Sequence, residues 1–262
     1  MKSEKIKFTN AEGHQLAARI EFPDENTIGY ALFAHCFTCN KNLTAVRNIG
    51  KALTDNGIAV LRFDFTGLGE SEGEFENTNF SSNVEDLISA AQFLEQNYQA
   101  PDILIGHSLG GAAVLFAASE IKSVKAVVTI GAPSNPKHVS HLLKSGINEI
   151  EANGEAIVNI GGREFKIKKQ FLDDLKEKSM QDTVKKMKKA LLVMHSPKDI
   201  TVGIENAEAI YKAGWHPKSF ISLDGADHLL SRKEDSRYAG KMIATWAERY
   251  ISKPLNLTHE SF

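Results

Sequence analysis

The feature that most constrains the fold is the stretch at residues 103–112, where an apolar run leads through a glycine-rich turn into small apolar residues. Gly106, Ser108 and Gly110 match the pattern G-x-S-x-G. Glycines on both sides of a serine let a strand and a helix meet at a sharp, strained turn. The N–H of the next residue, Leu109, then lies at a helix N-terminus, where negative charge is favoured. The stretch therefore predicts a strand–turn–helix unit that presents a nucleophilic serine.

Alternating strands and helices surround this unit. Continuous apolar runs are typical of strands that are buried on both faces of a parallel sheet. Runs of this kind predict buried strands at residues 30–34, 58–65, 124–130 and 190–194, and residues 219–223 predict a last strand. Apolar residues at helical spacing follow most of these runs, and the alternation predicts an α/β fold with a mostly parallel, doubly wound sheet. Residues 5–9 and 15–22 predict an antiparallel hairpin at the start of the chain.

The alternation breaks at residues 134–189, which are more polar than their surroundings. A hairpin at 156–167, with its turn at two glycines, and helical patterns at 171–175 and 180–187 are expected there. We interpret this segment as an inserted lid. The domain prediction is therefore a core formed by 1–133 and 190–253, a lid at 134–189 and a tail at 254–262.

Composition narrows the possible partners. The chain has 262 residues, of which 42% are hydrophobic, and this is enough for one large α/β domain. Its formal net charge of -2 gives no electrostatic case for binding nucleic acid or an anionic membrane. No apolar run approaches the roughly 18 residues of a spanning helix, and the charged N-terminus lacks the apolar region of a signal peptide. A soluble, cytoplasmic protein is expected.

A catalytic triad can be assembled around the serine. A serine hydroxyl is a weak nucleophile that needs a base, and the base needs an orienting carboxylate. Ser108, Asp199 and His228 each follow a predicted strand, in the order Ser, acid, His. The carboxyl ends of parallel strands meet at one edge of a sheet, where ligands bind. The sequence therefore predicts these three residues as nucleophile, acid and base.

Two other carboxylates compete for the role of the acid. Asp224 and Asp227 flank His228 in sequence. Because they lie on the loop of the histidine itself, we interpret them as residues that cap this loop through hydrogen bonds to its backbone.

Five other histidines compete for the role of the base. His107 directly precedes the nucleophile and should orient or pack the turn, and His35 should shape the loop after its strand. His195 precedes the acid in the chain, which makes it a poor base. His138 and His141 lie in the predicted lid and are interpreted as surface residues.

An oxyanion hole needs two backbone N–H donors that point at the developing negative charge. Leu109, the residue after the nucleophile, is predicted as one donor. The second should come from the loop after the strand at 30–34, where we assign Phe37, with Cys36 as the nearest competitor. The side chain of Phe37 could also line an acyl pocket.

No metal or cofactor is expected. Cys36 and Cys39 are the only two cysteines, and a closed structural zinc site needs four ligands. Their C-x-x-C spacing leaves a thiol-redox function open as an alternative. The glycine-rich loop at 66–73 lacks the Lys-Ser/Thr of a P-loop and the spacing of a dinucleotide-binding loop, which argues against nucleotide binding.

With these residues in place, the chain resembles the α/β-hydrolase superfamily over nearly its whole length. The resemblance rests on residues 106–111, on Asp199 in a Ser-Pro-Lys-Asp loop and on residues 225–228. Residues 33–39 and 62–69 look like hydrolases that are fused to a C-terminal OsmC-like redox domain. This resemblance implies an α/β-hydrolase fold, esterase-type serine chemistry and an inserted lid.

Two features depart from that pattern. His35 and Cys36 stand where these hydrolases usually have His-Gly. The chain ends at Phe262, which leaves no room for a second domain. We therefore expect either a stand-alone relative or a truncated fusion, with an OsmC-like domain only in longer relatives.

The predicted function is a cofactor-free serine hydrolase that cleaves carboxylic esters of short to medium acyl chains through an acyl-enzyme. The expected partner is a small-molecule acyl ester, and no oligomeric state is predicted. A thioesterase, a peptidase and a perhydrolase use the same triad and stay open. A non-catalytic binding module and a thiol-redox protein are the alternatives from other classes.

Overall fold

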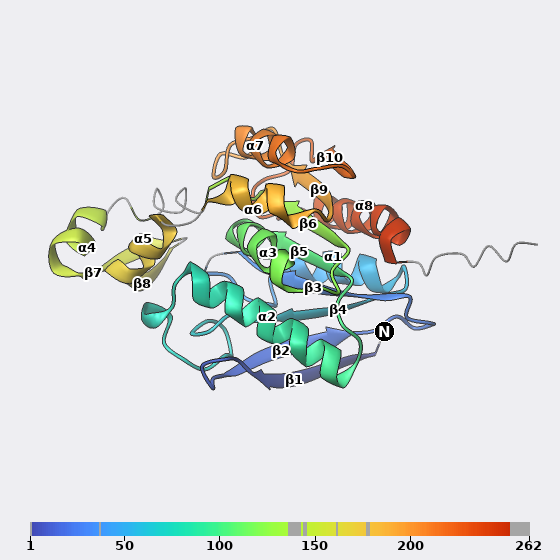
Figure 1. The fold of residues 1–262 in the computed structure, drawn as a ribbon, viewed down its shortest axis with the longest axis horizontal. Helices are drawn as coiled ribbons and strands as arrows, with labels where there is room; N and C mark the ends of the chain where they lie inside the picture. The colour runs from blue at the N-terminus through green and yellow to red at the C-terminus, as the bar shows by residue number, and fades with distance from the viewer. Residues whose placement is uncertain are drawn as a thin grey trace, which may run out of the picture.

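The computed structural model describes residues 2–36, 38–135, 143, 146–160, 162–176 and 179–251. A sheet of eight strands lies at the centre of this part of the chain (Figure 1). The strand order is β1-β2-β4-β3-β5-β6-β9-β10. The strands are β1 Ser3–Thr9, β2 Gln15–Glu21, β3 Gly29–Ala34, β4 Ile58–Phe63, β5 Ile103–His107, β6 Ala126–Ile130, β9 Ala190–His195 and β10 Lys218–Ser222. Strand β2 is antiparallel to β1 and β4, and the pairs from β4 through β10 are parallel. The predicted fold class is confirmed: an α/β-hydrolase fold with an antiparallel N-terminal hairpin.

The burial of the strands follows their composition. Every residue of β4, β5, β6 and β9 is buried, as the continuous apolar runs require. Strand β10 lies at the edge of the sheet, and its residues are partly or fully exposed. The central strands therefore form a rigid base from which the loops at their carboxyl ends project.

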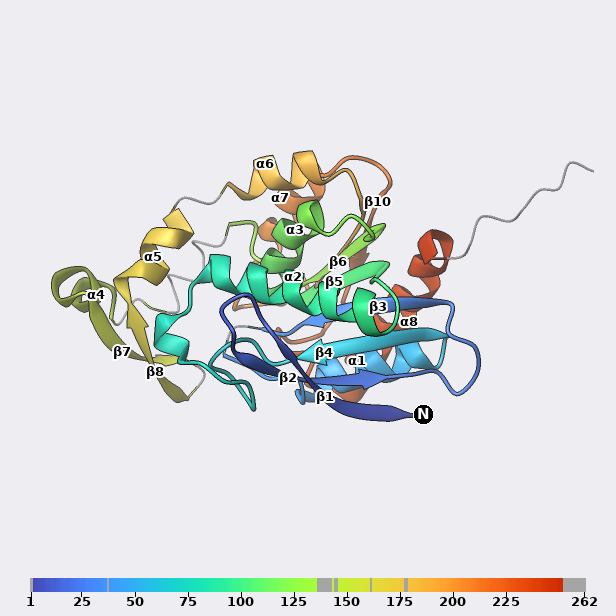
Figure 2. The same cartoon turned by 60° about the horizontal axis from the view of Figure 1, so that its bottom comes forward.

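Helices cover both faces of the sheet (Figures 1 and 2). On one face, α1 (Thr44–Thr54) packs against α8 (Lys233–Ile251), and Gly240 of α8 leaves room for the backbone of Ile49. On the other face, α2 (Phe80–Asn97), α3 (Leu109–Glu120), α6 (Met180–Met187) and α7 (Glu205–Ala213) share one apolar cluster. The two apolar layers hold the sheet between them, and this arrangement is the doubly wound architecture that the sequence predicts.

The start of α2 is fixed by a reciprocal pair of hydrogen bonds. Asn79 is the N-cap: its side chain accepts a hydrogen bond from the Ser82 N–H, and the Ser82 hydroxyl accepts one from the Asn79 N–H. This is a capping box in which serine replaces the usual Glu or Gln. The short 3-10 helix η1 (Phe75–Asn77) precedes it.

The segment between β6 and β9 contains the expected hairpin, formed by β7 (Glu155–Ile160) and β8 (Arg163–Lys168). Helix α4 (Ile147–Asn153) precedes the hairpin and α5 (Lys169–Lys176) follows it, and Figure 1 shows these elements together beyond one end of the sheet. Asp174 of α5 accepts hydrogen bonds from the backbone and hydroxyl of Ser81, which tie this unit to α2. The division into core and lid stays a prediction.

Some predictions fall on residues outside the described part of the chain. His138, His141 and the tail at 254–262 are among them. Among the described helices, none combines the length and the apolar character needed to cross a membrane.

Candidate active site

Ser108 lies in the turn between β5 and α3, and its backbone has a φ of 54°. This left-handed conformation is strained for a residue other than glycine. Gly106 and Gly110 make the turn possible, because a Cβ on Gly106 would overlap the carbonyl of Gly110, and a Cβ on Gly110 would overlap that of His35. The Ser108 N–H donates to the carbonyl of Ile130 at 2.8 Å, which anchors the turn to β6. The strand–turn–helix unit predicted from the sequence is present.

The structure brings the three predicted triad residues together. His228 Nε2 lies 3.0 Å from Ser108 Oγ, and His228 Nδ1 lies 2.7 Å from Asp199 Oδ2. Because an ionised carboxylate can only accept a hydrogen bond, Nδ1 of His228 carries the proton that faces Asp199. Nε2 is then free to accept the proton of the serine hydroxyl.

The carboxylate of Asp199 is fixed by the backbone of its own loop. Its Oδ1 accepts hydrogen bonds from the N–H groups of Thr201 at 2.9 Å and Val202 at 2.8 Å. Burial alone would raise the pKa of Asp199, but hydrogen bonds from His228, Val202 and Thr201 outweigh this effect and hold the pKa below its usual value. The carboxylate is therefore charged near neutral pH and presents one oxygen to the histidine.

The two rival carboxylates have local partners instead. Asp227 Oδ1 accepts from the Ser231 N–H at 2.7 Å, and Asp224 Oδ1 accepts from the Ser222 hydroxyl at 2.5 Å. Both side chains are exposed at the protein surface. The Asp227 contact is a loop-capping bond to the backbone, as expected, whereas Asp224 binds a side-chain hydroxyl.

Three buried histidines lie at the carboxyl ends of β5, β9 and β3 and bond to backbone carbonyls around the triad. His107 Nε2 lies 2.7 Å from the carbonyl oxygen of His228, and His195 Nε2 lies 2.7 Å from that of Val202. His35 Nδ1 lies 2.8 Å from the carbonyl oxygen of Cys36. Burial lowers the pKa of His107 to about 3, with the neighbouring His228 as the next cause, and burial also lowers the pKa of His35. Their shared position at strand ends is the signal that could have marked them as part of the site.

On the predicted oxyanion side, Leu109 is the first residue of α3, so its N–H belongs to the free donors of the helix N-terminus. Cys36 and Cys39 form a disulfide in the loop after β3. Phe37, the other predicted donor, lies between them and outside the described residues. The pairing of the cysteines is a feature that the sequence analysis left open.

A buried ionic network that the sequence analysis missed holds the far end of this loop. Asp64 accepts hydrogen bonds from the Lys41 N–H at 2.6 Å, from Lys41 Nζ at 2.5 Å and from the Glu70 N–H at 3.0 Å. Arg62 donates to the carbonyl of Lys41 and pairs with Glu21 at 2.8 Å. A Cβ on Gly69 would overlap the Asp64 carboxylate, which explains the glycine at this position of the loop.

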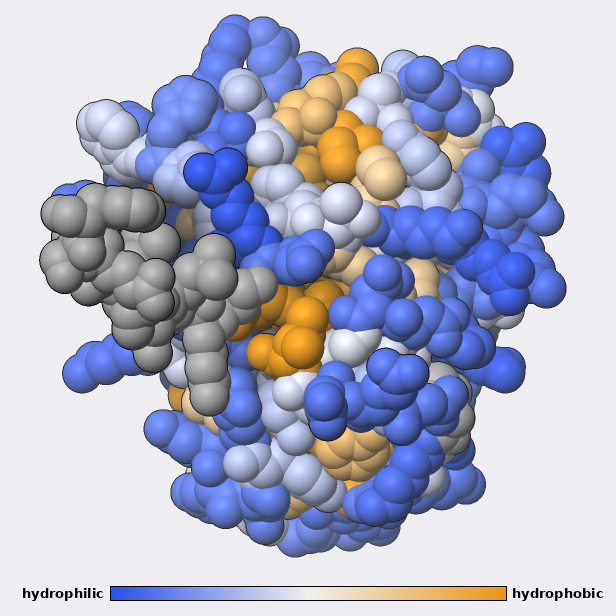
Figure 3. Space-filling model, turned by 90° about the vertical axis from the view of Figure 1, so that its right-hand side faces the viewer, coloured by the Kyte–Doolittle hydropathy of each residue, from blue (hydrophilic) through white to orange (hydrophobic). Residues whose placement is uncertain are grey.

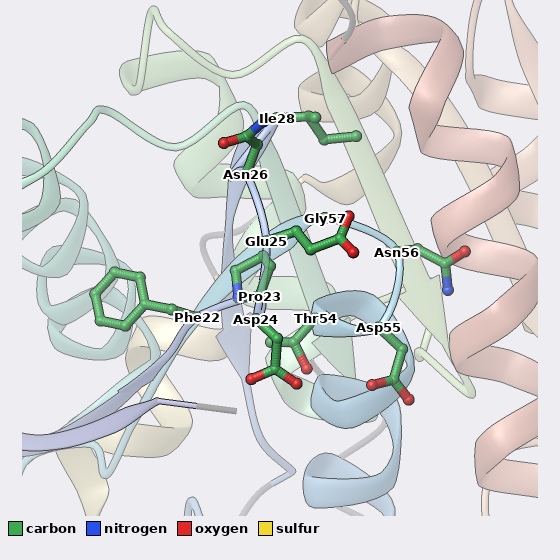
Figure 4. A pocket seen from close by; sticks show the side chains of 10 residues that line it. All are labelled: Phe22, Pro23, Asp24, Glu25, Asn26, Ile28, Thr54, Asp55, Asn56 and Gly57. Atoms are coloured by element: carbon green, nitrogen blue, oxygen red, sulfur yellow. The ribbon is translucent and has the colours of Figure 1, made fainter.

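Two cavities differ in their relation to the triad. One of about 10 Å³ borders Leu109 and Cys36, with Phe65 and Leu68 among its other lining residues. Another of about 490 Å³ lies at the amino ends of β3 and β4, lined by residues 22–26, Ile28 and residues 54–57 (Figure 4). On the side of the molecule that is on the right in Figure 1, hydrophobic residues form separate patches among hydrophilic ones (Figure 3). The larger cavity is at the opposite end of the strands from Ser108 and cannot serve the triad.

The described residues contain no group of three or more His, Cys, Asp or Glu side chains placed to hold a metal ion. The nitrogen and oxygen atoms of His228 and Asp199 instead form hydrogen bonds with each other and with Ser108. The arrangement can activate a hydroxyl by general-base catalysis with the protein's own side chains.

Comparison with known proteins shows similarity to hydrolases in sequence and fold. Residues 38–153 match the family model Hydrolase_4, described as "Serine aminopeptidase, S33". The crystal structure of the esterase domain of a Rhodothermus marinus protein is 50% identical, covers 96% of this chain and 100% of that domain, and superposes with a TM-score of 0.79. Est1E from Butyrivibrio proteoclasticus, solved with ferulic acid, has a similar fold at 21% identity and a TM-score of 0.77, over 94% of this chain and 99% of that one.

The curated relatives match over a shorter stretch. The mitochondrial palmitoyl-protein thioesterase ABHD10 of Bos taurus is 30% identical over 100 residues, which are 38% of this chain and 31% of that protein. An uncharacterized 31.7 kDa protein of Escherichia coli is 31% identical over 127 residues, which are 45% of this chain and 42% of that protein. The matches therefore span less than half the length of these relatives.

Proposed function

The chain belongs to the α/β-hydrolase superfamily, and we propose that it is a serine hydrolase that cleaves carboxylic esters of short to medium acyl chains. The observation that carries the proposal is the continuous hydrogen-bonded line from Asp199 through His228 to Ser108, with distances of 2.7 Å and 3.0 Å. A strained serine that faces an imidazole, whose opposite nitrogen is held by a fixed carboxylate, is the arrangement that serine hydrolases use to activate the hydroxyl.

In the first half of the reaction, Ser108 Oγ attacks the ester carbonyl carbon while His228 Nε2 takes the hydroxyl proton. Asp199 stabilises the imidazolium that forms, and the N–H groups of Leu109 and Phe37 bind the oxyanion. The tetrahedral intermediate then breaks its bond to the leaving oxygen, which receives the proton from His228. The alcohol departs, and the acyl group stays on Ser108.

In the second half, a water molecule replaces the alcohol. His228 removes a proton from this water as the oxygen attacks the acyl carbon, and a second oxyanion forms. Its collapse breaks the bond to Ser108 Oγ, which takes the proton back from His228. The carboxylic acid leaves and the enzyme returns to its starting state without any external cofactor.

The substrate class rests on one comparison. The Rhodothermus marinus relative that covers this chain almost completely is named an esterase domain, and its 50% identity supports the same chemistry for this chain. Esters of short and medium acyl groups are the proposed substrates.

A thioesterase activity is the second candidate, because the ABHD10 relatives carry that name over their shared stretch. A thioester uses the same nucleophile, base and oxyanion donors, and only its leaving group differs.

The test is a comparison of p-nitrophenyl esters from acetate to laurate with matched acyl-CoA thioesters, using the wild type and Ser108→Ala. We expect ester turnover that declines at the longer chains and disappears in the variant. Turnover of thioesters alone would replace the esterase proposal with the thioesterase one. Activity that persists in Ser108→Ala would reject both.

A further inference from the structure

His107 bonds to the residue that serves as the catalytic base in the proposed function, but at its backbone rather than at its ring. His107 Nε2 lies 2.7 Å from the carbonyl oxygen of His228. The carbonyl can only accept, so His107 must carry its proton on Nε2. Consecutive residues of the chain therefore contact the same histidine: His107 its main chain, and Ser108 its ring at 3.0 Å.

The environment of His107 suits a fixed neutral donor. The residue ends β5, pairs with Ile130 of β6 and is almost completely buried. Its Nδ1 is buried with no hydrogen-bond partner among the described residues, so a proton there would add an unpaired buried charge. Burial lowers the pKa of His107 to about 3, and the charge of His228 lowers it next. The hydrogen bond to the His228 carbonyl and the charge of Asp199 oppose this shift, and the charge of His35 adds to it. The imidazole stays neutral over the working range of the triad.

The loop that carries His228 needs such an anchor. Two side chains bind carbonyls of this loop. Ser196 donates to the carbonyl of Ala226 at 2.6 Å, and His107 donates to the carbonyl of His228. The ring of His228 lies with its centroid 5.1 Å from that of His107. The contact with Asp199 fixes the orientation of the His228 ring, whereas the contact with His107 fixes the position of the His228 backbone relative to β5.

We propose that His107 is a positioning residue that holds the backbone of His228 at the distance from Ser108 that proton transfer requires. The inference rests on the proposed function. Because β5 carries both His107 and the nucleophile, the base is positioned from the same strand that presents the serine. A displacement of the base by about 1 Å can cost about 100-fold in rate, so a single hydrogen bond at this place has a large effect on catalysis.

The experiment compares three variants with the wild type. His107→Leu removes the donor while keeping an apolar side chain of similar size, and His107→Gln places an amide N–H where Nε2 stands. Thr129→Val is the matched control, because Thr129 is fully buried on the neighbouring strand and its hydroxyl has no hydrogen-bond partner among the described residues.

We expect His107→Leu to lower kcat by about 10- to 100-fold with little change in KM, since only the transfer of the proton suffers. His107→Gln should restore most of this loss, and Thr129→Val should keep the wild-type kcat. An unchanged kcat in His107→Leu, an equal loss in His107→Gln, or a similar loss in Thr129→Val would overturn the proposal.

A measurement on the wild type covers the case in which His107→Leu fails to fold. Long-range proton–nitrogen NMR of the imidazoles should show His107 as the Nε2–H tautomer, with no titration between about pH 5 and 8. The Nδ1–H tautomer, or a titration in that range, would contradict the contact. Failure of the proposed function is distinguishable, because the wild type itself would then hydrolyse no ester.

Discussion

Asp199 binds His228 with one carboxylate oxygen and its own loop with the other: Oδ2 lies 2.7 Å from His228 Nδ1, and Oδ1 accepts the N–H groups of Thr201 and Val202. Because the loop backbone fixes one oxygen, the other oxygen holds the imidazole of His228 in one orientation. The contact also distinguishes Asp199 from Asp224 and Asp227, whose oxygens bind local hydroxyl and backbone groups.

Replacement of Asp199 by Asn should lower kcat by about 10⁴-fold, the loss typical of this change in a Ser-His-Asp triad, because an amide can stabilise the wrong tautomer of His228. KM should change little, since Asp199 does not touch the substrate. The measurement is the rate constant of Asp199→Asn beside those of Asp224→Asn and Asp227→Asn, which should stay near the wild type. A dead Asp227→Asn with a nearly normal Asp199→Asn would show that the acid is misassigned.

The buried His107 should make the protein less stable in acid. Its pKa in the folded state is about 3, below the value of about 6.5 for an unfolded chain. Above pH 6.5 neither state is protonated there and the group has no effect. As the pH falls from about 6.5 towards 3, only the unfolded state gains the proton, so stability falls by up to about 1.4 kcal/mol per pH unit.

The check is urea unfolding of the wild type and His107→Gln at about pH 4.5 and about pH 7.5. The two proteins share all other titrating groups, so the contributions of these groups to the pH dependence cancel in the comparison. We expect the wild type to lose more free energy of unfolding than the variant between the two pH values. Equal losses would mean that His107 does not stay neutral in the folded state.

The ion pair of Lys41 and Asp64 should contribute to stability only as a pair. Both side chains are almost completely buried, 3% and 1% exposed, so removing the lysine leaves the buried carboxylate of Asp64 without its cation. Lys41→Met should therefore lower the free energy of unfolding by about 3–5 kcal/mol. The double variant Lys41→Met with Asp64→Asn should lose less than the sum of the single changes, as measured in a double-mutant cycle. Simple additivity would argue against the pair.

The cysteines should be dispensable for ester cleavage. Cys36 and Cys39 are joined by a disulfide, and the proposed chemistry at that loop uses backbone N–H groups rather than sulfur. We expect the double variant Cys36→Ser with Cys39→Ser to keep most of the wild-type turnover. A loss as deep as that of Ser108→Ala, in a folded protein, would mean that the sulfur atoms take part in the reaction.

The periodicity of the sequence was sufficient for the fold. Strands such as β5 and β9 are buried on both faces, so their apolar runs stand out, and the order of Ser108, Asp199 and His228 follows from the topology. The start of α2 was less predictable, because Asn79 and Ser82 cap it reciprocally and a serine takes the place of the usual Glu or Gln.

Contacts between residues far apart in the chain could not be predicted in the same way. The bonds from His107 to His228 and from Arg62 to Glu21 join segments that a sequence pattern does not connect. The roles of the three triad residues, of Leu109 and of Phe37 stay predictions, as do the cytoplasmic location, the lid and any OsmC-like partner.

The central claim is that Ser108 is a nucleophile activated by His228, and a covalent label tests it most directly. The wild type, His228→Ala and Ser108→Ala are incubated with a fluorophosphonate, and intact mass and peptide mapping locate the adduct. We predict one adduct on Ser108 in the wild type, formation slowed by several orders of magnitude in His228→Ala, and none in Ser108→Ala. A wild type that hydrolyses esters but carries no adduct on Ser108 would contradict the account.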